Sequence, residues 1–349
     1  MIKKNIVIIL GAGASAEASF PTGPDLKEEI ATGLRFRFDP FELVSGDQVI
    51  YDALCRRFRV ENRIDKEMLD KHTTAGNKLS EVISSFVSID EALHWYSRDP
   101  DIVGLGKLAI ARFILYAEQS CPLASINKTT GRPELDDLSS SWLPHFLSLA
   151  ISAARHEDAK GIFRNVTVIN FNYDRSFEQY LYLALQAKAG VTPELAKQSL
   201  AALKIIRPYG SLGALDWQDD AGLKFGGTRN GDDLFSIAAR IRTYTEQIHT
   251  QIEGDINAAL KNASLVLILG FGFHPQNMAL LSKSLSQPDG VQRRVLGSVY
   301  KISPENHHGI EIELRNYLGG GPHTTVQLLN KTSAQIFDHL RPTINMAVS

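Results

Sequence analysis

The chain has 349 residues, of which 44% are hydrophobic and 22% are charged, and its 37 basic and 39 acidic side chains give a formal net charge of −2. The composition is that of a globular chain with a sizeable core, the length indicates roughly two domains, and the balanced charge excludes a global field for nucleic acid or anionic membranes. Two cysteines, Cys55 and Cys121, are too few for a disulfide framework or a zinc ribbon, and there is no secretory signal or membrane-length apolar run, so we expect a cytoplasmic protein without zinc.

The first predicted element is a buried strand, Ile6–Leu10, which runs directly into the small-residue turn Gly11-Ala12-Gly13-Ala14-Ser15. Its glycines allow a sharp turn and close approach of a ligand, and the following helix would direct free N–H groups at an anion such as a pyrophosphate. The spacing departs from the full dinucleotide fingerprint, because Ala16 stands at the third glycine position and no acidic residue is evident about 20 residues further on. Alone, the motif fits a nucleotide loop and a structural turn equally well.

Helical patterns dominate the region that follows. Asp25 is expected to cap a helix beginning near Leu26. Further amphipathic helices, with few strand signals among them, are predicted around Val49–Phe58, Lys78–Phe86, Asp90–Tyr96, Ile102–Glu118 and Trp142–Arg155. We therefore expect a helical insertion over residues 36–159, between two parts of one Rossmann-like domain, 1–35 and 160–349.

Strand patterns then resume and alternate with helices. The strands are predicted at Asn165–Ile169, Lys204–Arg207, Ser264–Leu269, Arg294–Lys301 and Thr324–Leu329, and helices are predicted between most of them, notably over Leu234–Leu260. Such alternation indicates an α/β fold with a mostly parallel sheet and helices on both faces.

In open α/β sheets, ligands bind beyond the carboxyl ends of the strands, so the residues after each apolar run are examined together. Four such ends stand out: the glycine turn, Asn170-Phe171-Asn172-Tyr173-Asp174, Pro208-Tyr209-Gly210-Ser211-Leu212 and Gly270-Phe271-Gly272-Phe273-His274. Alternation along an extended segment places Asn170, Asn172 and Asp174 on one face.

Each of these segments also has an ordinary structural interpretation. Asp174 is a plausible cap for a helix around Phe177–Tyr180, Tyr209 a half-buried aromatic, and His274 a satisfied surface or core histidine. Their joint occurrence at successive strand ends favours a shared site.

In their order along the chain, these four segments resemble the SIR2-like (sirtuin-related) family, in the bacterial branch found in antiphage defence. Ser88-Ile89-Asp90-Glu91-Ala92-Leu93 resembles a helical segment of that branch, and the similarity spans about residues 5 to 330. The resemblance implies a Rossmann-like domain that binds NAD as its substrate and cleaves the bond between nicotinamide and ribose.

The resemblance also implies roles for single residues. Asn172 matches the family's catalytic asparagine, which hydrogen-bonds the nicotinamide ribose and positions the attacking water, and Asp174 matches its acidic partner. A carboxylate or amide oxygen there would stabilise positive charge that develops on the ribose. The residues expected to bind NAD are Gly11, Ala12, Gly13 and Ser15 near the pyrophosphate and ribose, Gly270 and Gly272 at the phosphates and adenosine ribose, and Ser303 at the adenosine end. Asn170 is expected to bind NAD as well.

Tyr209 departs from the family pattern, which has a histidine as general base before the glycine. A phenol titrates near pH 10 when unperturbed and is a poor base at neutral pH, although His274 is a spatial substitute to consider. The zinc ribbon of the sirtuin deacylases is missing, and their Pro-Asp-Phe-Arg segment is replaced by Pro21-Thr22-Gly23-Pro24. Protein deacylation is therefore not expected, and Tyr209 enters the candidate catalytic set with Asn172 and Asp174.

The expected function is an NAD+ glycohydrolase that depletes NAD in antiviral defence. Such an enzyme must stay silent until triggered, which implies homo-oligomerisation or a separately encoded partner, such as an ATPase or a nucleic-acid-sensing protein. The alternative is a catalytically weak or inactive module that binds NAD or ADP-ribose and acts through a partner, which Tyr209 favours. An ordinary Rossmann dehydrogenase would need a catalytic His or Lys and a ribose-binding acid after the second strand, and neither is evident.

Overall fold

The structure is a computed structural model that describes residues 2–40, 42–126, 133–152, 154–227, 233–244, 246, 250–282, 292–318 and 323–348. Its centre is a six-stranded sheet in the order β10-β9-β8-β1-β6-β7, in which every pair of neighbours is parallel. The strands are β1 (Ile6–Leu10), β6 (Val166–Asn170), β7 (Lys204–Ile206), β8 (Leu265–Leu269), β9 (Arg293–Ser298) and β10 (Thr324–Leu329).

The strand order identifies the topology. The chain enters the sheet at its centre with β1, adds β6 and β7 on one side, and then adds β8, β9 and β10 on the other. This is the Rossmann order, and its direction reverses between β1 and β8, where ligands of such sheets bind. The prediction of an α/β fold with a Rossmann-like parallel sheet is confirmed.

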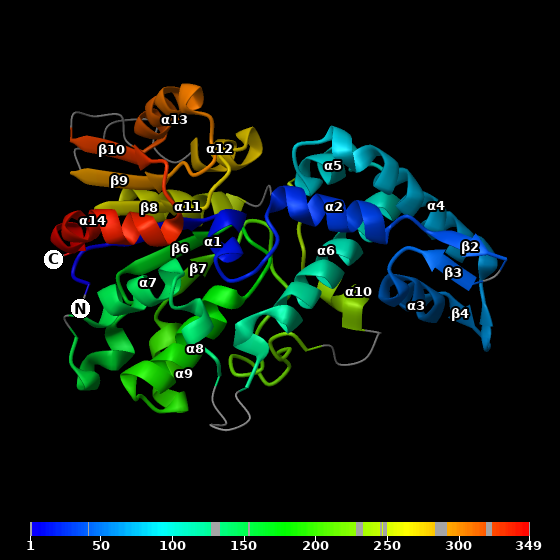
Figure 1. Ribbon diagram of the computed structural model, residues 1–349, viewed down its shortest axis with the longest axis horizontal. Helices are drawn as coiled ribbons and strands as arrows, with labels where there is room; N and C mark the ends of the chain where they lie inside the picture. Colours follow the sequence, from blue (N-terminus) through cyan, green and yellow to red (C-terminus); the bar gives the residue numbers. More distant parts are fainter. Residues whose placement is uncertain are drawn as a thin grey trace.

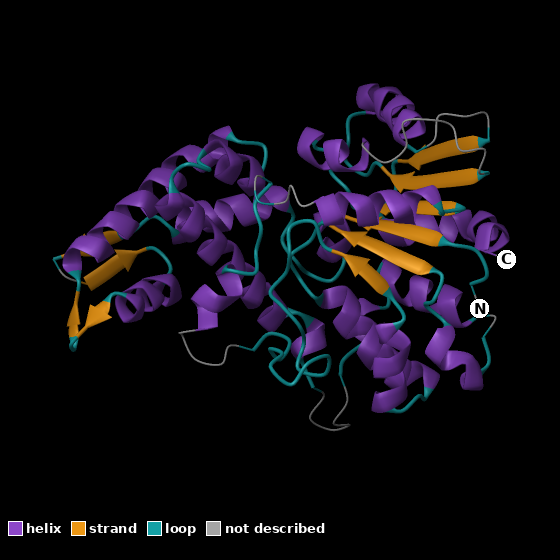
Figure 2. Cartoon of the chain, turned by 180° about the vertical axis from the view of Figure 1, so that it is seen from behind, coloured by secondary structure: helices purple, strands orange, loops and turns teal. Residues whose placement is uncertain are grey.

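Helices cover both faces of the sheet, as Figures 1 and 2 show. Because side chains alternate along a strand, Val7 and Ile9 belong to one hydrophobic core, and Ile6, Ile8 and Leu10 belong to the other. The second core is completed by the short α1 (Ala12–Ala16), α7 (Trp142–Ile151), α8 (Ser176–Ala189), α9 (Pro193–Ala201) and α14 (Ser333–Val348), and the first by α11 (Thr250–Lys261), α12 (Pro275–Ser282) and α13 (Pro304–Tyr317).

A group of helices lies to one side of the sheet, on the right in Figure 1. It is built on α6 (Pro100–Ser120) and includes α2 (Gly23–Gly33), α3 (Gln48–Arg57), α4 (Lys66–Val82), α5 (Ile89–Trp95) and α10 (Asp233–Ala238). Two small antiparallel hairpins lie at its far end: β2 (Arg37–Asp39) with β3 (Glu42–Ser45), and β4 (Arg59–Val60) with β5 (Arg63–Ile64). The insertion boundaries 36–159 stay a prediction. In space, α2 and α10 pack on α6 although they come from outside that range.

Several helix boundaries differ from the predictions. Asp25 is not the cap of a helix at Leu26: α2 starts at Gly23, and the Thr22 N–H and hydroxyl donate to the Asp25 carboxylate at 2.9 and 2.5 Å in a capping box. The helix predicted at Lys78–Phe86 is the end of α4, which begins at Lys66.

The helical structure predicted over Leu234–Leu260 is confirmed at the two ends of that range and does not continue through residues 239–244. α10 ends at Ala238 and α11 begins at Thr250, and residues 245 and 247–249 between them lie outside the described residues. After α10 the backbone turns to the loop that follows β7, where the Arg242 N–H donates to the Tyr209 carbonyl at 3.0 Å.

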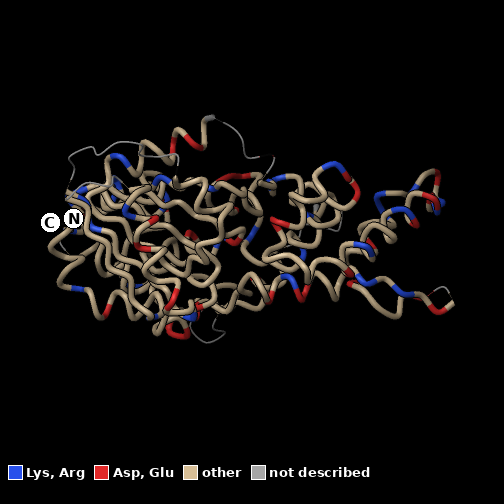
Figure 3. Tube along the Cα trace, turned by 90° about the horizontal axis from the view of Figure 1, so that it is seen from above, with Lys and Arg blue, Asp and Glu red and all other residues tan. Residues whose placement is uncertain are grey.

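Charged residues of both signs are interspersed along the chain, as Figure 3 shows. Among the described residues, no helix has the length and apolar character needed to span a membrane. Cys55 and Cys121 are both free thiols, and Cys121 is buried.

Candidate functional site

A cavity of about 460 Å³ opens at the carboxyl ends of the strands, beside the switch point between β1 and β8. This volume lies within the range of pockets that bind small ligands. The predicted site residues in its lining are Gly11, Ala12, Gly13, Ser15, Asn172, Asp174, Tyr209, Gly270 and Gly272. The structure thus brings together, from four separate strand ends, most of the residues that the sequence singled out.

The glycines of the two central loops are required by contact between those loops. A Cβ on Gly11 would lie 2.6 Å from the Gly270 carbonyl oxygen, and one on Gly270, whose φ is +58°, would lie 1.9 Å from the Ala14 backbone nitrogen. The Gly13 N–H donates to the Gly270 carbonyl at 2.9 Å, and the Ala14 N–H to the Gly11 carbonyl at 2.9 Å. The expectation that these N–H groups are free to bind an anion is therefore wrong for both.

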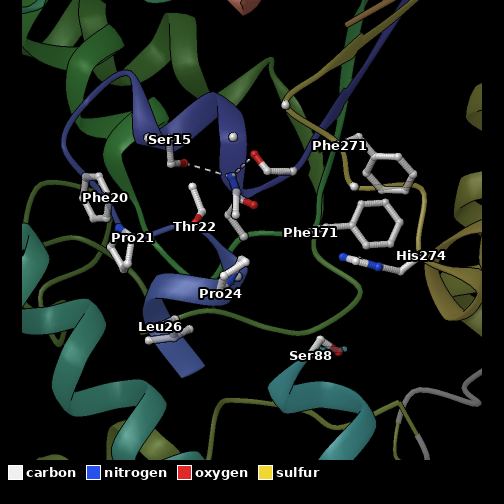
Figure 4. A pocket seen from close by; sticks show the side chains of 18 of the residues that line it. Ser15, Phe20, Pro21, Thr22, Pro24, Leu26, Ser88, Phe171, Phe271 and His274 are labelled. Atoms are coloured by element: carbon white, nitrogen blue, oxygen red, sulfur yellow. Dashed lines mark hydrogen bonds between the residues drawn. The ribbon is translucent and has the colours of Figure 1, made fainter. Parts of the chain in front are cut away.

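Asn172 is held in place by hydrogen bonds from its side chain and from its backbone. Its Nδ2 donates to the Gly11 carbonyl at 2.9 Å and to Ser15 Oγ at 2.8 Å, and its backbone N–H donates to Asn170 Oδ1 at 3.0 Å. Figure 4 shows Ser15 and its hydrogen bond at the wall of the cavity. Nothing in the described part of the chain donates to Asn172 Oδ1, so this amide oxygen is the atom that remains for a ligand.

Asn170 and Ser303 take other places than predicted. Asn170 is 2% exposed and supports the Asn172 loop without lining the cavity. Ser303 is the N-cap residue of α13, is exposed, and hydrogen-bonds Glu305. Tyr300 and Lys301 from the same loop line the cavity instead, because β9 ends at Ser298, earlier than predicted.

Asp174 lines the cavity and lies just before α8. The N-cap residue of this helix is Arg175, not Asp174 as the ordinary interpretation expected. Asp174 Oδ1 accepts the Ser176 N–H at 3.0 Å and the Ser176 hydroxyl, and its other oxygen, Oδ2, has no donor among the described residues. The two bonds therefore fix the carboxylate while leaving one oxygen to the cavity.

Tyr209 is a wall residue whose hydroxyl is engaged. It is 2% exposed, its ring packs on Phe171 and Tyr173, and its hydroxyl donates to Asn277 Oδ1 on α12 at 2.6 Å. Gly210 follows with a φ of +70°, and a Cβ there would lie 2.1 Å from the Arg240 carbonyl oxygen. The tyrosine donates its proton in this arrangement and is not poised to accept one.

His274 lies in the same cavity. Figure 4 shows its ring beside Phe171, facing the space that Ser15 and Ser88 border. Desolvation by burial lowers the pKa of His274 below its usual 6.5, so the ring is neutral at pH 7. No hydrogen bond joins the ring to another group within the described ranges. The spatial substitution considered from the sequence is thus compatible with its position.

Asp90 and Tyr173 are site residues that sequence reasoning missed. Asp90 lies on α5 and lines the cavity. Its carboxylate accepts a hydrogen bond from the hydroxyl of Tyr173, the residue that follows Asn172 in the chain. Desolvation raises the pKa of Asp90 from 3.8 to about 6. The resemblance marked Ser88–Leu93, but no spacing argument could bring α5 to the edge of the sheet.

Glu17 is a second missed carboxylate in the lining. It accepts the Trp142 N–H at the start of α7 at 2.9 Å and the Ala334 N–H at the start of α14 at 3.2 Å. Desolvation raises its pKa, although these bonds oppose the shift. Glu17 therefore ties the glycine turn to two helix N-termini.

Comparison with known proteins assigns no function to the chain: no protein-family model matches it, and no curated protein matches it. Within the described ranges, no three His, Cys, Asp or Glu side chains are grouped so that they could hold a metal ion. We therefore infer the function from the geometry of the cavity.

Proposed function

We propose that this chain is an NAD+ glycohydrolase of the SIR2-like type, which binds NAD in the cavity and hydrolyses the bond between nicotinamide and ribose. The observation that carries the proposal is the Asn172 side chain. Both protons of its amide are used by Gly11 and Ser15, and its oxygen is left to the cavity at the switch point of a Rossmann sheet. An oriented amide oxygen is suited to hold a ribose hydroxyl or a water.

The cavity offers complementary groups for the rest of the ligand. Aromatic side chains, Phe171 and Phe271 among them, form an apolar wall against which a flat ring can pack. Lys301 brings a positive charge to the end of the lining formed by the loop after β9, and Ser15 and Thr22 bring hydroxyls. A dinucleotide requires such a combination of apolar surface, hydroxyl partners and positive charge.

In the proposed reaction, the bond from ribose C1′ to the nicotinamide nitrogen breaks and its electron pair stays with that nitrogen. Positive charge develops on the ribose, where the Asn172 amide oxygen and the Asp174 carboxylate would stabilise it. A water oxygen then bonds to C1′ and loses one proton. Tyr209 is excluded as the acceptor of that proton because its hydroxyl donates to Asn277.

The second candidate is a module that binds NAD or ADP-ribose and regulates a partner. The position of Tyr209 favours it, since the family's histidine is replaced by a buried, hydrogen-bonded tyrosine. For the enzyme, the proposal includes NAD depletion in antiviral defence, released by self-association or by an ATPase or nucleic-acid-sensing partner.

The two candidates are separated by incubating the purified chain with NAD, alone and with the product of a neighbouring gene, and measuring nicotinamide release and NAD binding. We expect Asn172→Ala to lower kcat about 10²–10³-fold. Asn262→Ala changes an exposed asparagine between α11 and β8, at the amino ends of the strands and away from the cavity; it is the matched control and should leave kcat unchanged. NAD binding without nicotinamide release in any preparation would establish the regulatory module, and absence of binding would contradict both.

A further inference from the structure

We propose that Asp90, which α5 brings to the cavity from the helical group, is the general base of this site and takes the proton from the water that attacks ribose C1′. The inference rests on the proposed function and assigns the one step that Tyr209 leaves without an acceptor. It gives the helical group a direct part in the chemistry.

The start of α5 forms one wall of the cavity. Ser88 caps the helix by accepting the Glu91 N–H at 3.1 Å, and Ser88, Ile89 and Asp90 all line the cavity. Figure 4 shows Ser88 across the cavity from Ser15 and the glycine turn. A carboxylate on this wall faces the same space as the Asn172 loop.

One oxygen of Asp90 is fixed and the other is left over. Its Oδ1 accepts the Tyr173 hydroxyl, and Tyr173 follows Asn172 in the chain. Over the described ranges, no other residue donates to Oδ2, and the Asp90 backbone N–H also bonds the carboxylate and lowers its pKa as Tyr173 does. The tyrosine thus orients the carboxylate relative to Asn172, and Oδ2 retains the lone pairs needed to accept a proton.

The protonation state of the Asp90 carboxylate suits a general base. Desolvation in the cavity wall raises the pKa of Asp90 to about 6, while the hydrogen bond from Tyr173 acts in the opposite direction. At pH 7 the carboxylate is ionised and is a stronger base than an ordinary aspartate.

Other titratable groups surround this wall. Tyr173 faces Asp90 directly, with Tyr209 behind it. Glu91 and His94 lie on α5, Lys27 of α2 donates to the Phe86 carbonyl at 2.5 Å, and His274 comes from the loop after β8. Among them His274 is the competing base, and its own substitution separates its contribution from that of Asp90.

The reaction consumes one NAD and one water. The water oxygen forms a bond to C1′, the bond between C1′ and the nicotinamide nitrogen breaks, and neutral nicotinamide leaves with the electron pair. The proton of the water passes to Asp90 Oδ2 and then to solvent.

The test is the pH dependence of kcat for nicotinamide release between pH 4 and 9. The wild type should lose activity below about pH 6, and Asp90→Asn should lower kcat about 10²–10⁴-fold while NAD binding is unchanged within a factor of two. Tyr173→Phe keeps the carboxylate but removes the bond that lowers its pKa, so the acid limb should move to higher pH.

Two substitutions serve as matched controls. Asp70→Asn changes an exposed aspartate of α4, and Tyr180→Phe removes a buried hydroxyl for which the described part of the chain holds no partner. Both should leave the profile unchanged. Wild-type kcat and acid limb in Asp90→Asn, or an acid limb that only His274→Asn removes, would overturn the inference but leave the glycohydrolase intact. A wild type that binds NAD and releases no nicotinamide would instead refute the proposed function.

Discussion

Alanine at Gly270 tests whether the contact between the two central loops holds the site together. Gly270 has a φ of +58°, and an added Cβ would lie 1.9 Å from the Ala14 nitrogen and 2.2 Å from the Gly13 carbonyl carbon. Both are backbone atoms, so no rotamer change relieves the clash. The loops must separate, which also strains the Gly13 N–H bond to the Gly270 carbonyl.

The magnitude follows from a matched glycine elsewhere. Gly190, at the C-terminal cap of α8, has a φ of +68° with nothing within 4 Å of its Cβ position. Gly190→Ala therefore meets only the left-handed conformation, a cost of about 1–2 kcal/mol, partly offset by about 0.4–1 kcal/mol from the less flexible unfolded chain. Gly270→Ala adds about 1–3 kcal/mol of overpacking and about 1 kcal/mol for the weakened hydrogen bond, so its total loss should be about 2–6 kcal/mol.

Equilibrium unfolding in urea, followed by circular dichroism, measures both losses on one scale. Gly309→Ala, in the middle of α13 with open space around its Cβ position, is the control of opposite sign and should gain up to about 1 kcal/mol. NAD binding should be lost in Gly270→Ala and retained in Gly190→Ala. Equal losses of stability in the two variants would refute the argument that the loops touch at Gly270.

Two further predictions concern buried charges. Glu118 and Arg175 form a 2.5 Å ion pair with side chains no more than 2% exposed. Glu118→Ala leaves the buried guanidinium without its carboxylate and should lower the free energy of unfolding in urea by about 3–5 kcal/mol. Glu118→Gln should lower it clearly less, and equal losses in the two variants would contradict this. Asp90 has a folded pKa of about 6 against 3.8 in the unfolded chain, so the folded state binds its proton more tightly and stability falls as pH rises through that window. At about 1.4 kcal/mol per pH unit, Asp90→Asn should exceed the wild type in stability by up to about 3 kcal/mol at pH 8, with the difference vanishing by pH 4. A difference in melting temperature between Asp90→Asn and the wild type that does not change with pH would contradict the raised pKa of Asp90.

The parallel sheet was predictable because its strands are buried on both faces and read as unbroken apolar runs. Ile6–Leu10 begins and ends where it was predicted, and Leu265–Leu269 differs by one residue. The small hairpins were not predictable by the same signal, since β2 and β4 are short, fully exposed, and carry Arg37 and Arg59. The helical pattern of Leu234–Leu260 is interrupted by a tertiary bond, between Arg242 and Tyr209, which periodicity does not encode.

For the site as well, local sequence patterns predicted some residues and tertiary packing decided the others. Asn172, Asp174 and Tyr209 were found because strand ends of a parallel sheet converge at one edge. Asp90 and Glu17 were not, because their positions depend on how α5 packs against α2 and α6 and on where α7 and α14 begin. The role of Gly11 and Gly13 was assigned to ligand approach, whereas the neighbouring backbone of Gly270 already requires glycine there.

The central position of β1 has a consequence for biosynthesis. Within this sequence β1 is made before both of its neighbours, since Ile6 pairs with Val166 and with Leu265. At about 5–20 residues per second, the Ile-Val-Ile-Ile-Leu segment lacks its β6 neighbour for roughly 8–32 s and its β8 neighbour for roughly 13–52 s. During that interval it is an apolar, uncharged β-strand of the kind that associates with other chains. We therefore expect the yield of folded protein to depend on protection of this segment during synthesis as well as on the stability of the finished sheet.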